Sequence, residues 1–157
     1  MYKKQLTKEQ ALQKLRHYCG YQERCHAEVK TKLYELGVRK ADHDEIISTL
    51  IEEDYLNEER FAIAFAGGKF RMKQWGRIKI KYELKQKQVS EYNIKKALKQ
   101  VNEEDYLKTL DKLAEEKYST LKSEQWLTTK KKTMDYLIQK GFEPELINRA
   151  IQKITRD

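Results

Sequence analysis

Apolar residues recur through most of the chain at spacings of three and four, which places them on one face of an α-helix. Breaks in this pattern coincide with residues that begin or end helices. Thr7 and Gln10 match a capping box before the first helix, and Asn102 is placed to cap a later one. Gly37 and Gly141 are typical left-handed helix ends. The pattern predicts nine helices and no strands.

The other helix starts are predicted from polar caps and from the single proline. They lie near Asp42 or Asp44, at Asn57, near Trp75, at Ser90, and just before Pro144. The apolar periodicity also predicts which side chains form the core. Positions expected to face inward include Ile51, Phe65 and Leu107 and, on the helix from Trp75, the set Trp75, Ile78 and Tyr82, with Leu84 at its edge.

Three segments share a pattern in which a leucine is followed five residues later by an apolar residue. The pairs are Leu33/Val38, Leu84/Val89 and Leu137/Phe142, and a short helix is predicted after each. Their spacing of about fifty residues predicts a three-helix unit repeated three times, with the core completed by stacking of neighbours. We therefore expect an all-α, elongated tandem array of three three-helix repeats, with boundaries at 1–56, 57–101 and 102–157.

Composition agrees with helices rather than sheets. Of the 157 residues, 39% are hydrophobic and 37% charged, and one proline with six glycines leaves little turn chemistry for a sandwich or barrel. The first ten residues carry cations without the apolar run of a signal peptide, and no later run approaches membrane-spanning length. We expect a cytoplasmic monomer with reduced cysteines and no contact with membrane.

Charge is distributed unevenly along the chain, although its net value is +8. Residues 42–60 contain eight acids and one base, a local charge of −7. Residues 69–87 contain eight bases and one acid, a local charge of +7. Such asymmetry indicates an interaction surface, and the basic segment points to a polyanionic partner. The acidic segment either meets a basic partner or neutralises basic residues within the chain.

The stretch GGKFRMKQWGRIKI (67–80) raises the question of a phosphate-binding loop. It lacks the Walker spacing and follows a helical pattern, so we interpret Gly67 and Gly68 as small residues at a helix crossing or helix end. The cluster HYCGYQERCH (17–26) contains four potential zinc ligands but no Cys-x-x-Cys spacing. No catalytic motif is present, so we expect no enzyme activity, no metal and no cofactor.

The basic segment is the candidate binding site. Its predicted binding residues are Lys69, Arg71, Lys73, Arg77, Lys79, Lys81 and Lys85. A secondary basic patch is predicted at Lys130, Lys131 and Lys132, joined by Lys122 and Arg149. Trp75 is expected to pack inward rather than to stack on a base.

The order of residues 52–98 resembles the central signature of the RecX family of regulatory proteins. The shared elements are Tyr55-Leu56, the run NEERFA from Asn57 to Ala62, the bases Arg71 to Lys73, Trp75-Gly76, and Ile80 to Leu84. The segment 11–38 is similar to the family's first repeat, whereas the third repeat matches in helical pattern alone. Gln88 stands where the family often has glycine.

The resemblance implies a non-enzymatic regulator of the RecA recombinase in DNA repair, DNA recombination and the SOS response. Members bind the RecA filament on single-stranded DNA and modulate, mostly inhibit, its ATPase and strand exchange. Two alternatives stay open on the residues alone. One is a general basic DNA-binding protein with helix-turn-helix-like units, and the other is a scaffold for an acidic protein.

Overall fold

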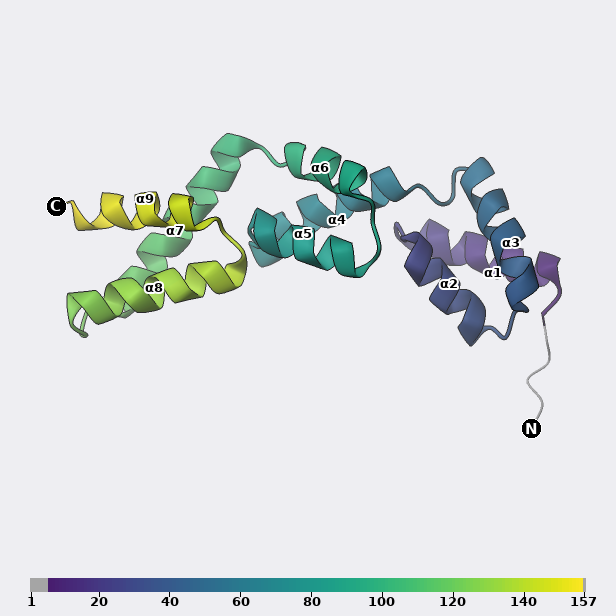
Figure 1. The fold of residues 1–157 in the computed structure, drawn as a ribbon, viewed down its shortest axis with the longest axis horizontal. Helices are drawn as coiled ribbons and strands as arrows, with labels where there is room; N and C mark the ends of the chain where they lie inside the picture. Colours follow the sequence, from purple (N-terminus) through teal and green to yellow (C-terminus); the bar gives the residue numbers. More distant parts are fainter. Residues whose placement is uncertain (1–5, 157) are drawn as a thin grey trace. The chain divides into compact units, whose positions relative to one another are not determined.

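The computed structural model describes residues 6–156, which contain nine helices and no strand (Figure 1). The helices are α1 (Lys8–Tyr21), α2 (His26–Glu35), α3 (Lys40–Glu52), α4 (Glu58–Lys73), α5 (Arg77–Gln86), α6 (Glu91–Lys99), α7 (Glu103–Thr120), α8 (Trp126–Lys140) and α9 (Pro144–Thr155). The fold is therefore the predicted all-α class, built from three-helix repeats. No helix in this part of the chain has the length and apolarity that crossing a membrane requires.

The chain forms two compact units, and the helices α4, α5 and α6 are each divided between them. The first unit comprises the chain through Ala64 together with Leu84–Lys96, and the second comprises Phe65–Glu83 together with the chain from Ala97 onward. Each unit is described by itself below. The repeat boundaries expected after residues 56 and 101 stay a prediction.

Helix starts follow the predicted polar caps. The Thr7 hydroxyl accepts from the Gln10 N–H at 3.2 Å, and the Gln10 side chain accepts from the Thr7 N–H at 3.0 Å. Asn57 and Asn102 each accept a backbone N–H three residues ahead at 2.9 Å. α3 differs, because it begins at Lys40 and its N-cap, Arg39, makes no side-chain cap bond. Asp42 lies inside its first turn, where the helix dipole favours a carboxylate.

The three leucine pairs found in the sequence mark one repeated helix-ending turn. In each turn the apolar residue's N–H donates to the leucine carbonyl: Val38 to Leu33 at 3.0 Å, Val89 to Leu84 at 3.1 Å, and Phe142 to Leu137 at 3.2 Å. The residue before it is left-handed each time, with φ of 71° at Gly37, 63° at Gln88 and 99° at Gly141. These are Schellman turns, so the repeat predicted from spacing has the same local geometry in all three places.

α1, α2 and α3 pack against one another around a shared apolar core. Its fully buried members include Leu15, Leu33 and Leu50. Ile51 was expected to be buried with them but is 45% exposed. A salt bridge also joins α1 to the end of α3, because Arg16 donates to both carboxylate oxygens of Glu53 at 2.7 and 2.8 Å.

The last three helices, α7, α8 and α9, also pack against one another (Figure 1). Tyr106 is fully buried at its centre, with ring centroids 5.7 Å from Phe70 and 5.2 Å from Phe142. The sequence pattern placed Leu107 in this core, but Leu107 is 36% exposed and the neighbouring Tyr106 takes the buried position.

Within the second unit, the start of α5 meets the end of α8 at two glycines. The Gly76 N–H donates to Lys140 O at 2.8 Å, and the Ile78 N–H donates to Gly141 O at 2.9 Å. A Cβ on Gly76 would lie 2.3 Å from Gly141 C, and one on Gly141 would lie 2.3 Å from Lys79 Cβ. Two helix ends thus satisfy each other's unpaired backbone groups, and only glycine permits the approach.

The buried face of α5 differs from the prediction for that helix. Ile80 and Leu84 are fully buried, whereas Ile78 is 50% and Tyr82 60% exposed. The reason is that the apolar residues of α5 alternate along the chain, so they occupy both sides of the helix.

The interpretation of Gly67 and Gly68 is wrong as well. α4 runs through both glycines to Lys73. A Cβ on Gly67 would meet the Arg71 guanidinium at 2.7 Å, and one on Gly68 would meet nothing within 4 Å. Gly67 therefore leaves room for an arginine that lies along its own helix, and neither glycine is at a helix crossing.

Candidate basic docking surface

Within the second unit, α4, α5 and the end of α8 carry six cations without a carboxylate partner, which we call together the α4–α5 basic face. Its members are Lys69, Arg71, Lys73, Lys79, Lys81 and Lys140. Arg71, Lys73 and Lys81 are exposed, and the other three are half-buried. Among the described residues, no carboxylate lies within 4.0 Å of any of these six side chains. The face is therefore an uncompensated positive surface.

Trp75 lies beneath two of these cations. The ammonium groups of Lys69 and Lys79 stand 5.1 and 4.6 Å from the centre of its ring system, at cation–π distance. The edge of Trp75 meets the Phe65 ring at a centroid distance of 6.4 Å. Trp75 is half-buried, so it packs against the protein on one side and holds two lysines at the surface on the other.

Lys140 belongs to this face although sequence analysis missed it. Its Nζ donates to Lys73 O at 2.7 Å, and burial together with the charges of Lys79 and Lys73 lowers its pKa. A lysine that like charges disfavour marks a site where an anion would be stabilised. No sequence pattern connects residue 140 to residues 73 and 79, because the contact depends on the two glycines.

Exposed apolar side chains lie among the same cations. Met72 is 83% exposed, and Ile78 and Tyr82 are half or more exposed. A surface that combines cations with exposed aliphatic and aromatic groups can bind an acidic protein surface or a nucleic-acid strand.

Arg77, predicted as a binding residue, is used inside the protein. Its side chain is 22% exposed, its guanidinium lies 3.8 Å from the centre of the Tyr106 ring, and its Nη1 pairs with Glu143 at 2.7 Å. A second ion pair joins it to Glu103. The Tyr106 hydroxyl accepts the Arg77 N–H at 2.9 Å and donates to Glu143. This network ties α5 to α7 and to the start of α9.

The remaining predicted cations are not among these six. Lys85 belongs to the first unit and lies 3.6 Å from Glu91. In the secondary patch, Lys132 pairs with Glu124 at 2.9 Å, Lys130 is half-buried and Lys131 is exposed. Consecutive residues of a helix point in different directions. The secondary patch stays a prediction.

The acidic segment finds partners within the first unit. Glu45 pairs with Lys8 at 2.7 Å, Glu59 with Lys96 at 3.3 Å, and Asp54 with Arg60 at 3.1 Å. Glu53 pairs with Arg16 as described above. Most of these ion pairs link different helices of the first unit, and the basic partners are not members of the α4–α5 basic face.

The two cysteines and His43 are buried in the first unit. Cys19 and Cys25 are buried, and burial raises the pKa of both thiols to about 11. His43 is buried against Val38 O, with Nε2 at 3.0 Å. Within residues 6–156, no three histidine, cysteine or acidic side chains converge as metal ligands would.

Two family models match the chain. The first is described as "RecX, second three-helix domain" and matches residues 57–98. The second is described as "RecX, third three-helix domain" and matches residues 103–151. Between them they account for more than half of the chain.

Relatives and solved structures agree with these matches. "Regulatory protein RecX" from Bacillus cytotoxicus is 28% identical over 89% of this chain, and that from Clostridium perfringens is 33% identical over 83%. The chain spans 52% and 61% of their respective lengths. The crystal structure of RecX from Lactobacillus salivarius shares the fold with a TM-score of 0.86 at 23% identity, covering 96% of this chain and 97% of that one.

Proposed function

Since this chain belongs to the RecX family of regulatory proteins, we propose that it binds the RecA recombinase filament on single-stranded DNA. In this proposal it acts in the cytoplasm without catalysing a reaction, and it restrains the filament's ATP hydrolysis and strand exchange. The α4–α5 basic face is the docking surface. A filament offers both acidic protein surface and DNA phosphate to such a face.

One observation carries the proposal: six cations of the second unit have no carboxylate partner, two of them stand over Trp75, and Lys140 lies close enough to Lys73 and Lys79 for their charges to lower its pKa. Elsewhere in the described residues many bases are paired, such as Arg16, Arg60 and Arg77. A surface of one sign favours association with an opposite surface and speeds the encounter. The exposed Met72, Ile78 and Tyr82 add apolar contact area that phosphate alone does not need.

A general DNA-binding protein is the second candidate, because the same face would attract phosphate. Such a protein would bind naked single strands tightly, with an affinity that falls steeply as salt rises. Its binding would not depend on the recombinase. The two candidates therefore predict different results when recombinase activity and naked DNA binding are measured together.

The test is RecA ATP hydrolysis on single-stranded DNA, titrated with this protein and with the triple variant Arg71→Glu, Lys73→Glu, Lys81→Glu. All three side chains are exposed, so the fold should tolerate the changes. We expect the wild type to inhibit well below the concentration that coats naked DNA. The triple variant should need at least about tenfold more protein for half inhibition, because attraction becomes repulsion.

A matched control carries the same change in net charge on exposed lysines of the first unit: Lys30→Glu, Lys40→Glu, Lys95→Glu. It should inhibit like the wild type. Equal inhibition by the triple variant and the wild type would remove the basic face from the proposal. No effect of the wild type on the recombinase, with tight and salt-sensitive binding to naked DNA, would favour the second candidate.

A further inference from the structure

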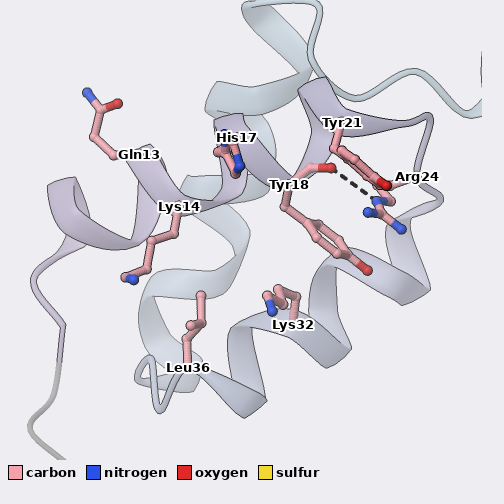
Figure 2. Close-up of a pocket in the computed structure, with 8 residues that line it drawn as sticks. All are labelled: Gln13, Lys14, His17, Tyr18, Tyr21, Arg24, Lys32 and Leu36. Atoms are coloured by element: carbon pink, nitrogen blue, oxygen red, sulfur yellow. Dashed lines mark hydrogen bonds between the residues drawn. The ribbon is translucent and has the colours of Figure 1, made fainter.

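A cavity of about 510 Å³ opens between α1 and α2 in the first unit (Figure 2). Its volume lies within the range of about 300–1,000 Å³ that is usual for small-molecule sites. The side chains that give it its chemistry are Lys14, His17, Tyr18, Tyr21, Arg24 and Lys32. Lys14, Tyr18 and Tyr21 come from α1, Lys32 comes from α2, and Arg24 comes from the short link between these helices.

Aromatic surface and positive charge occur together in this cavity. The Arg24 guanidinium lies 3.7 Å from the centre of the Tyr18 ring, and Lys32 Nζ lies 5.4 Å from it. Tyr21, in contrast, is 79% exposed. No carboxylate is among the side chains that line the cavity. Of the cations that line it, Lys32 has Glu35 at 4.0 Å, at the limit of an ion pair.

Arg24 is held in a fixed orientation with donors to spare. Its Nε donates to Tyr18 O at 3.1 Å, the dashed line in Figure 2. No hydrogen bond recorded within residues 6–156 uses its two terminal nitrogens. An arginine fixed through Nε presents the rest of its planar fork to a ligand, and that fork matches phosphate oxygens.

From this arrangement we propose that the α1–α2 cavity binds one nucleotide of a single-stranded nucleic acid. The base stacks on the exposed Tyr21 ring, the adjacent phosphate is bound by Arg24, and Lys14 and Lys32 attract the neighbouring phosphates of the strand. An acidic peptide would satisfy the cations but has no flat group for the tyrosine. A duplex would satisfy the cations but keeps its bases stacked inside. A single strand offers a phosphate and an unstacked base side by side.

The inference extends the proposed function, since a strand-bound filament contains such nucleotides, but its test needs no recombinase. The host is the triple variant Arg71→Glu, Lys73→Glu, Lys81→Glu, in which the α4–α5 basic face no longer attracts DNA. The probe is a short oligodeoxythymidine with one 5-bromodeoxyuridine. Its affinity is measured by fluorescence anisotropy, and the site of photo-cross-linking is mapped by mass spectrometry.

We expect cross-links at Tyr18 or Tyr21. In the host, Tyr21→Ala should weaken oligonucleotide binding at least about fivefold, the lower end of what one base stack contributes. Lys14→Glu with Lys32→Glu should weaken it about tenfold or more, whereas the control Lys30→Glu with Lys40→Glu should stay within about twofold. A glutamate peptide of equal charge should not compete.

Cross-links confined to other parts of the chain would overturn the proposal, as would unchanged affinity in both cavity variants. Effective competition by the glutamate peptide would overturn it in favour of an acidic protein segment. Loss of these effects while the wild type still inhibits RecA removes the cavity proposal alone. Specific cross-links in a protein that leaves RecA unaffected would remove the proposed function alone.

Discussion

The turns that end α2 and α8 share their backbone geometry but differ in their surroundings. Gly37 and Gly141 are both left-handed, and both precede an apolar residue whose N–H donates back to a leucine carbonyl. A Cβ on Gly37 would meet nothing within 4 Å, whereas one on Gly141 would stand 2.6 Å from Lys79 N. One turn therefore ends a helix only, and the other also holds the start of α5.

The difference teaches that a repeated motif need not have a repeated role. In the first unit, the surface between α1 and α2 stays open as a cavity lined by cations. In the second unit, the end of α8 meets the start of α5, and Glu103 and Glu143 pair with Arg77 at that start. The same kind of turn is thus left open in one place and forms a packing contact in the other.

The largest effect is expected from Gly141→Ala. The new methyl group would overlap the backbone of α5 while φ at this residue is 99°, so two penalties add. We expect the free energy of unfolding to fall by at least about 3 kcal/mol, measured by urea denaturation followed by circular dichroism.

Gly37→Ala is the matched change, because it meets the left-handed penalty without the overlap. It should cost about 1 kcal/mol. Gly68→Ala, in the middle of α4 with open space around it, should instead stabilise by about 0.5–1 kcal/mol. Equal losses at positions 37 and 141 would mean that the contact with α5 contributes nothing.

A loss smaller than that of Gly141→Ala is expected from Tyr106→Phe, which keeps the ring and removes the hydroxyl. That hydroxyl accepts the Arg77 N–H and donates to Glu143, and it lies in a fully buried residue. Removing it should lower the free energy of unfolding by about 1–3 kcal/mol. Tyr82→Phe, at a tyrosine of the same unit that is 60% exposed, should change stability little. A Tyr106→Phe variant as stable as the wild type would show that the network does not fasten α5.

The smallest effect is expected at the second repeat's version of the turn, where a glutamine occupies the left-handed position. Gln88→Gly should raise the free energy of unfolding by about 0.5 kcal/mol, because glycine adopts φ of 63° without strain. The same substitution two residues earlier, Gln86→Gly, falls on the last residue of α5 and should lower the free energy of unfolding by about 0.5 kcal/mol. Destabilisation by Gln88→Gly would show that the glutamine side chain has a role of its own.

Most of the fold could be predicted because its signals are local. Caps such as Thr7 with Gln10, and turns such as Gly37-Val38, act within a few residues and appear directly in the sequence. The buried face of α5 could not be predicted in this way. The apolar residues Ile78, Ile80, Tyr82 and Leu84 alternate, so the pattern offers two apolar sides, and only tertiary packing buries Ile80 and Leu84.

The basic surface could be predicted in part for the same reason. Charge counting found Lys69 to Lys81 because those cations are neighbours in sequence. It could not separate Arg77, whose acidic partners lie 26 and 66 residues away, from the exposed lysines beside it. Nor could it assemble the α1–α2 cavity, because Lys14, Arg24 and Lys32 come to line one cavity only through the packing of two helices.

The contact between Gly76 and Gly141 also limits how this protein can evolve. Arrays of repeats commonly change length by gaining or losing whole units at the level of the gene. A deletion that removed α8 would expose the Gly76 and Ile78 N–H groups, and a duplication inserted between the second and third repeats would separate the two glycines. The second and third repeats are therefore expected to be inherited together, whereas the open turn at Gly37 imposes no such linkage.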